Sequence, residues 1–208
     1  MRFSSTIVLI TLVLLLSAAA ACAQDDEGYA ASRDAGTAAA VRQLSDRDPL
    51  VRQRAAEVLA GFSAIEQQRL VEGYRMQEKN DRVRLALDWA LYRMGKRDAL
   101  YGVVNGLRSD SRRAQAVGYL SQLPGPRFLE PFFMHTDNKT LIGLLEVMAS
   151  IGDGDSLEFV KPYTASLEPK VADAARFAER EITTRLAQPQ PDTLTRPREV
   201  GKPVNSVP

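Results

Sequence analysis

The side chains that most often carry catalysis or hold metals are scarce in this chain, which contains one cysteine, Cys22, and one histidine, His135. A disulfide or a thiolate metal site needs further cysteines, and a histidine metal site needs further ligands. The sequence also lacks the G-x-S-x-G, H-E-x-x-H and C-x-x-C patterns and a glycine-rich phosphate loop. We therefore expect no catalytic residue, metal or cofactor, and interpret the chain as a binding protein rather than an enzyme. His135 is expected to end a helix and interact with its dipole.

Cys22 follows a stretch, residues 1–21, that has the basic start, the apolar run and the small residues of a secretory signal peptide. The apolar run is shorter than the roughly 20 residues that span a bilayer. Two cleavage sites remain open. The sequence Ala19-Ala20-Ala21-Cys22 resembles a bacterial lipobox, which implies cleavage before Cys22 and a lipid on its sulfur. Because Ala23 rather than Asp follows Cys22, the resemblance implies an outer-membrane lipoprotein that faces the periplasm. Cleavage after Ala23 leaves a soluble periplasmic protein.

The elements that position the other residues follow from an internal repeat. Apolar residues recur at offsets 4, 7, 8 and 11 in five segments, a spacing typical of the buried stripe of an amphipathic helix. The segments start about 30 residues apart, at Val51, Val83, Arg112, Thr140 and Val171. Acidic residues that are suited to cap these helices stand near each start: Asp48, Asp81, Asp110, Asp137 and Glu168. One helix of each repeat is thereby predicted.

Segments of suitable length for a partner helix lie before or between these helices: Thr37–Leu44, Ser63–Glu78, Asp98–Leu107, Pro126–Met134 and Ser156–Leu167. Ser63 and Glu66 fit a capping box at the start of the second segment. Pro131 and Pro162 interrupt the last two, so those helices are expected to be kinked or to start late. Each repeat is then a helical hairpin.

Residues 48–59, DPLVRQRAAEVL, resemble the HEAT repeat in its short form, named after phycobilisome lyases, and the resemblance extends over residues 37–182. It implies an all-α fold, a right-handed α-solenoid of about five HEAT-like helical hairpins. It also implies that the arginine directly after the first residue of a repeat bonds an Asp of a neighbouring turn. Arg52, Arg84 and Arg113 occupy that position and are expected to form a structural ladder. The expected organisation is a signal peptide (1–21), a linker (22–36), the repeat domain (37–187) and a proline-rich disordered tail (188–208).

The surface that binds a partner is expected on the second helix of each repeat, which lines the concave face in this family. Positions at offsets 3, 6 and 10 are expected to be the more exposed ones: Arg54, Glu57, Trp89, Arg93, Gln122, Glu146 and Phe177. Tryptophan and arginine are enriched at binding hot spots, so Trp89 beside Arg93 is the foremost candidate contact. The alternative is that Trp89 packs between helices as part of the core.

The charge balance gives no support for binding to nucleic acid, because Lys plus Arg number 27 and Asp plus Glu number 26. We therefore predict a protein-binding scaffold or adaptor in the bacterial cell envelope, which touches the membrane only through a lipid anchor. Two alternatives stay open. One is a regulatory subunit or an uncharacterised HEAT-like enzyme that uses carboxylates of the concave face, and the other is a structural protein whose tail binds an envelope polymer.

Overall fold

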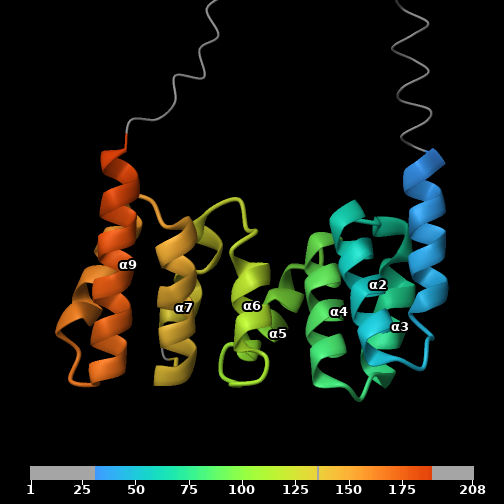
Figure 1. The fold of residues 1–208 in the computed structure, drawn as a ribbon, viewed down its shortest axis with the longest axis horizontal. Helices are drawn as coiled ribbons and strands as arrows, with labels where there is room; N and C mark the ends of the chain where they lie inside the picture. Colours follow the sequence, from blue (N-terminus) through green and yellow to red (C-terminus); the bar gives the residue numbers. More distant parts are fainter. Residues whose placement is uncertain (1–30, 135, 189–208) are drawn as a thin grey trace, which may run out of the picture.

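The computed structural model describes residues 31–134 and 136–188, and all regular structure within these ranges is helical. The all-α prediction is therefore confirmed. Successive helices follow one another along the long axis, from the helix over residues 31–43 at one end to α9 at the other (Figure 1). The predictions for the signal peptide, Cys22, His135 and residues 189–208 of the tail lie outside the described residues.

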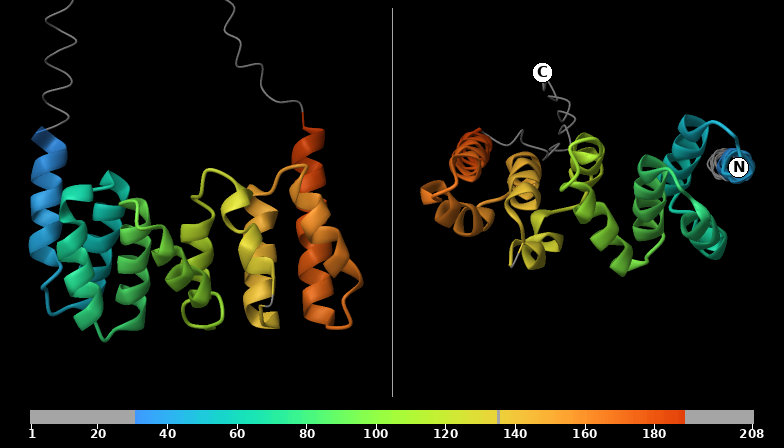
Figure 2. Two further views of the ribbon diagram at one scale, coloured as in Figure 1. Left: turned by 180° about the vertical axis from the view of Figure 1, so that it is seen from behind. Right: turned by 90° about the horizontal axis from the view of Figure 1, so that it is seen from below.

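A helix occurs at each of the five predicted places: α2 (Pro49–Phe62), α4 (Asp81–Arg93), α6 (Arg113–Leu120), α7 (Asn138–Ile151) and α9 (Pro169–Ala187). Further elements lie between them: η1 (Ile65–Gln67), α3 (Gln68–Gln77), η2 (Arg97–Ala99), α5 (Leu100–Gly106), η3 (Pro126–Phe128), η4 (Glu130–Phe133), α8 (Ser156–Val160) and η5 (Lys161–Ala165). Seen from below, the chain runs to and fro between two rows of helices (Figure 2). The helix over residues 31–43 begins before the predicted start at Thr37.

The predicted helix over 126–134 is wrong, because the structure has only the 3₁₀ turns η3 and η4 there. Pro126 and Pro131 lack the amide hydrogen that an α-helix interior needs, and a proline ring clashes with the preceding turn. The last partner helix is interrupted as its sequence predicts. Its α-helical part ends at Val160, and Pro162 lies in the 3₁₀ segment η5.

The core is built from the repeated apolar columns. Residues at offsets 4 and 8 are buried in the first four repeats: Ala55, Leu59, Leu87, Leu91, Ala116, Leu120, Leu144 and Met148. The offset-7 column differs between the ends of the chain: Val58 in α2 is 41% exposed, whereas Ala178 in α9 is 0% exposed.

Helix caps follow the sequence in part. Asp48 accepts a hydrogen bond from the Leu50 amide, and Asp137 accepts from the amides of Lys139 and Thr140. Elsewhere the predicted cap is displaced. Asn80 rather than Asp81 caps α4, Arg112 rather than Asp110 precedes α6, and Glu168 makes no side-chain cap bond.

The predicted capping box at Ser63 is wrong. Ser63 ends α2 in the left-handed region, with φ 48° and ψ 48°, and the following 3₁₀ turn has no side-chain cap. A left-handed conformation costs a residue with a Cβ about 1–2 kcal/mol, and glycine adopts it at little cost. The position therefore suits glycine better than serine.

We expect Ser63→Gly to raise the free energy of unfolding by about 1 kcal/mol, because it removes the left-handed strain at the end of α2. Urea denaturation followed by circular dichroism measures this change. The matched control is Ser121→Gly at the end of α6, where φ is −69°. No gain is expected there, and an equal gain from both variants would contradict the explanation.

Candidate binding site beside Trp89

A cavity of about 400 Å³ lies where the C-terminal ends of α4 and α6 meet the loops that follow them. Its lining residues are Trp89, Tyr92, Arg93, Gly95, Arg97, Gln122, Leu123 and Pro124. Three of the predicted contact residues, Trp89, Arg93 and Gln122, therefore line one cavity. We refer to it below as the Trp89 cavity.

Trp89 is 2% exposed, so its assignment to the exposed positions is wrong. Its ring stacks on Tyr92 and on Tyr119, with ring centroids 5.6 Å apart in each pair. Packing against α2, α3, α5 and α6 buries nearly all faces of α4, including the face that carries Trp89. The tryptophan is thus a core residue that forms a wall of the cavity, as the alternative interpretation holds.

Tyr119 connects Trp89 to the predicted contact Glu57. Its hydroxyl donates to Oε1 of Glu57 at 2.5 Å and accepts from the side-chain amide of Gln115 at 2.8 Å. Burial raises the pKa of the Tyr119 phenol, and the hydrogen bond to Glu57 raises it further, while that from Gln115 opposes the shift. The phenol therefore stays neutral and holds α6 to α2. The predicted contact Glu57 is thus engaged in a hydrogen bond within the protein.

The cavity is basic. Cζ of Arg93 lies 5.6 Å from the centroid of the Trp89 ring, in the range of a cation–π contact. Burial raises the pKa of the Tyr92 phenol, and the nearby positive charges of Arg93 and Arg97 oppose that shift. Within the described ranges neither arginine has a carboxylate at ion-pair distance, and no acidic residue is among those that line the cavity. Two uncompensated cations thus flank an aromatic wall.

Gly95 brings Arg97 to the same cavity as Arg93. Its φ of 98° lies in the left-handed region, where glycine is favoured. The chain turns there at the end of α4, so that the 3₁₀ turn beginning at Arg97 follows within a few residues. Arg97 and Tyr92 were not predicted from the sequence, since neither falls on offset 3, 6 or 10 of a repeat. The basic residues on both sides of Gly95 were the available signal.

The remaining predicted contacts lie apart from the Trp89 cavity or at its edge. Gln122 is exposed at the edge, and its amide donates to the Gly118 carbonyl at 2.9 Å. Arg54 is exposed on α2, while Glu146 pairs with Arg113. Phe177 is 46% exposed on α9. The structure therefore does not gather these residues into one site.

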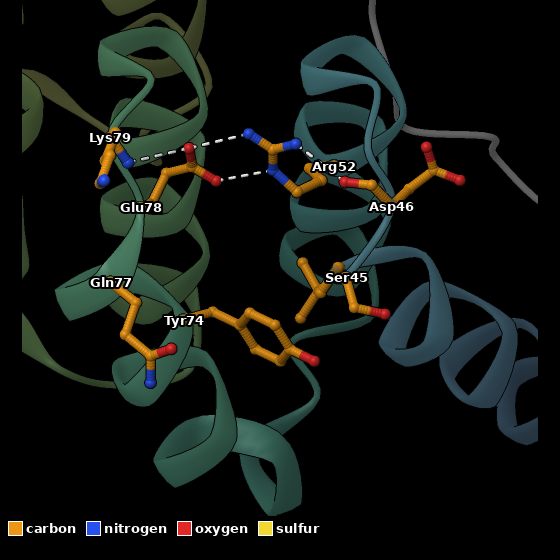
Figure 3. A pocket seen from close by; sticks show the side chains of 8 residues that line it. Ser45, Asp46, Arg52, Tyr74, Gln77, Glu78 and Lys79 are labelled. Atoms are coloured by element: carbon orange, nitrogen blue, oxygen red, sulfur yellow. Dashed lines mark hydrogen bonds and ion pairs between the residues drawn. The ribbon is translucent and has the colours of Figure 1, made fainter.

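The expected arginine ladder forms at two of its three positions, although with other acceptors. Arg52 donates to both carboxylate oxygens of Glu78, at 2.7 and 2.9 Å, and to the Asp46 carbonyl, beside a cavity of about 330 Å³ (Figure 3). Arg113 donates to the Lys139 carbonyl at 2.7 Å. Its Nε lies 3.3 Å from Glu146 without hydrogen-bond geometry. Arg52 thus ties α2 to the segment before α4, and Arg113 ties α6 to α7 itself, both as structural contacts.

The ladder expectation is wrong for Arg84. This side chain reaches only Asp81 of its own first turn, at 3.7 Å, and both groups are largely exposed. The next long helix, α6, begins late, at Arg113, so the helix start that would supply an acceptor is missing. An exposed pair of this kind contributes little to stability.

The Arg52–Glu78 pair makes stability depend on pH. The hydrogen bond from Arg52 lowers the pKa of Glu78 below 4.5, against the effect of burial. A carboxyl whose pKa is lower in the folded state stabilises fully above its unfolded pKa and loses that contribution as pH falls through the folded one. We expect Glu78→Gln to lower the free energy of unfolding by about 1 kcal/mol at neutral pH.

The difference between wild type and Glu78→Gln should shrink as the pH falls below 4.5, and denaturation at a series of pH values measures it. Glu66→Gln is the matched control, because Glu66 is exposed and has no ion pair in the described part of the chain. A difference that is independent of pH would contradict this account of the pair.

Among residues 31–134 and 136–188, no three or more His, Cys, Asp and Glu side chains gather in a group that could hold a metal. In the same ranges no helix combines the length and apolar character needed to cross a bilayer. Protein-family models, curated proteins and solved structures were compared with the chain, and none of them matches it.

Proposed function

We propose that this protein is a non-enzymatic scaffold or adaptor that binds another protein at the Trp89 cavity. The observation that supports it most is the pair Arg93 and Arg97, which flank an aromatic wall without acidic partners in the described residues. Arginine and aromatic residues are enriched where proteins bind one another, and such residues supply most of the binding energy.

The same proposal includes the architecture, a right-handed α-solenoid of about five HEAT-like hairpins. The near-constant spacing of the long helices and the alternation of two rows support it (Figure 2). In a solenoid each repeat contacts its neighbours, and the stacked repeats present an extended surface. The third and fourth hairpins are irregular, because α6 is short and η3 and η4 replace a helix.

The buried groups behind the cavity suit a binding role. Trp89 is fixed by stacking on Tyr92 and Tyr119, and Tyr119 is fixed in turn by Glu57. Arg93 lies over this rigid ring. A side chain that is already held in place loses less conformational entropy when a partner binds, so affinity increases without new contacts.

The proposed location is the bacterial cell envelope, either as an outer-membrane lipoprotein anchored at Cys22 or as a soluble periplasmic protein. It depends on the sequence of the first residues alone. Intact mass spectrometry of the mature protein tests it. A diacyl or triacyl mass on Cys22 supports the anchor, and a chain that begins at unmodified Gln24 supports the soluble form.

A quantitative pull-down tests the binding function. The full-length tagged protein is recovered from envelope extracts as wild type, as Arg93→Gln/Arg97→Gln, and as the control Arg69→Gln/Arg180→Gln, whose exposed arginines lie on α3 and α9. A partner should be retained by wild type and control and reduced about tenfold by the cavity variant. Equal recovery by all three would refute the assignment. Trp89 is left intact, since its removal would disturb the core.

A further inference from the structure

We infer that the Trp89 cavity recognises an acidic segment of the partner in extended conformation, with carboxylates on alternate residues. This inference rests on the proposed binding function and specifies its chemistry. The charge of the cavity, the burial of its aromatic ring and the arrangement of its two arginines support it.

Charge complementarity selects an anion. Arg93 and Arg97 bring two positive charges to the cavity, and its other lining residues are uncharged: Trp89, Tyr92, Gly95, Gln122, Leu123 and Pro124. The neighbouring cations Lys96 and Arg75 are neutralised by Glu72 and Asp88, at 2.5 and 2.8 Å. Lys96 and Arg75 thus have acidic partners, whereas Arg93 and Arg97 have none at ion-pair distance among the described residues.

The burial of Trp89 favours carboxylates on a peptide over nucleic acid. Proteins that bind single strands stack bases on accessible aromatic rings and follow the phosphate backbone with a longer basic groove. Here the Trp89 ring is 2% exposed and is already stacked between its neighbours in the core. The lining residues supply two cations only, and the whole chain has a net charge of +1.

The arrangement of the arginines suits an extended peptide. Arg93 comes from the last turn of α4 and Arg97 from the turn after Gly95, so the two guanidinium groups approach from separate elements. Side chains on alternate residues of an extended chain point to the same side. Two such carboxylates can each meet one guanidinium, while the peptide residue between them faces away from the cavity. The apolar groups of Tyr92 and Pro124 can pack against the backbone and the neighbouring side chains of the peptide.

Arg93 has one other role that the test must separate. A cation in the last turn of a helix interacts favourably with the helix dipole, so Arg93 also stabilises α4. If that were its whole role, its replacement would lower stability and leave binding unchanged. Binding and stability are therefore measured on the same variants.

Fluorescence anisotropy with a short labelled peptide, in which glutamates alternate with leucines, tests the inference on the full-length protein. We expect binding that weakens with salt, a loss of about tenfold in Arg93→Gln and about threefold in the more exposed Arg97→Gln. Arg69→Gln should bind as wild type. A peptide with glutamine in place of glutamate should bind at least about tenfold more weakly.

Several outcomes would overturn the inference. These are equal binding of the glutamine peptide, unchanged affinity in both cavity variants, or equally effective competition by single-stranded DNA. Self-association that the double variant abolishes would assign the cavity to a second copy instead. The acidic peptide can also show no binding while the Arg93→Gln/Arg97→Gln variant still loses its partner in the pull-down. In that case the proposed binding function stands, and only the inference that the ligand is acidic is refuted. If the peptide binds through both arginines and no partner depends on them, the scaffold function fails instead.

Discussion

Replacing Trp89 with alanine is expected to lower the free energy of unfolding by about 4 kcal/mol, the largest effect of any single substitution considered for this cavity. The ring is almost completely buried and stacks on two tyrosines, so its removal leaves a void that the backbone of several helices would have to close. Stacked aromatic pairs add to the loss beyond the area that becomes exposed. Denaturation by urea, followed by far-ultraviolet circular dichroism, measures it.

Two milder variants separate the causes of that loss. Trp89→Phe keeps an aromatic ring and should cost less than half as much, because most of the volume and one stacking contact remain. Tyr119→Phe keeps the ring that stacks on Trp89 and removes the hydroxyl that bonds Glu57, which should cost about 1 kcal/mol. If Trp89→Ala costs less than about 1 kcal/mol, the ring is not the packing centre described here.

Gly102→Ala is expected to destabilise the protein by about 3 kcal/mol, because α5 lies directly on the buried carboxylate of Asp88 in α4, which pairs with Arg75 of α3. A Cβ at Gly102 would be 2.6 Å from Cγ of Asp88 and closer still to its Oδ2. Asp88 is 7% exposed and accepts from Nε of Arg75 at 2.8 Å and from its Nη2 at 3.3 Å. The carboxylate would have to move away from Arg75, or α5 would have to move away from α4.

Gly73→Ala on α3 is the matched control for this substitution. A Cβ added at Gly73 meets nothing within 4 Å, so the only effect is the better helix propensity of alanine. It should stabilise by about 0.5–1 kcal/mol. Opposite signs for the two glycines are therefore expected in the same denaturation assay. A stabilising Gly102→Ala would show that α5 does not pack on Asp88 as described.

The sequence was sufficient to predict the helices that carry a regular spacing of apolar residues. Each of the five long helices lies where the apolar columns predict it, since burial on one side of a helix leaves a regular trace in the sequence. Prolines likewise indicated the interrupted segments near Pro131 and Pro162. What it did not predict was the loss of the α-helix altogether over 126–134, where two 3₁₀ turns suffice.

The candidate site was less predictable, because it depends on which neighbours surround a helix. The repeated apolar offsets predict that each of these helices is buried along one stripe only. In α4, however, every residue from Leu85 to Leu91 is buried. The offsets therefore place Trp89 among the exposed positions, whereas it is a core residue, as the alternative interpretation predicts. Arg97 belongs to no repeat position. Its proximity to Arg93 depends on the turn at Gly95, which the sequence marks only by the glycine itself.

Site-specific photo-crosslinking in living cells tests the central claim, that a partner protein binds at the Trp89 cavity. A photoreactive residue replaces exposed Gln122 at the edge of the cavity, and Arg180 on α9 serves as the control position. We predict that one partner is crosslinked from Gln122 and that it is not crosslinked from Arg180. The crosslink should be lost when Arg93 and Arg97 are changed to glutamine. The same partner crosslinked with equal yield from both positions, or after loss of both arginines, would contradict the claim.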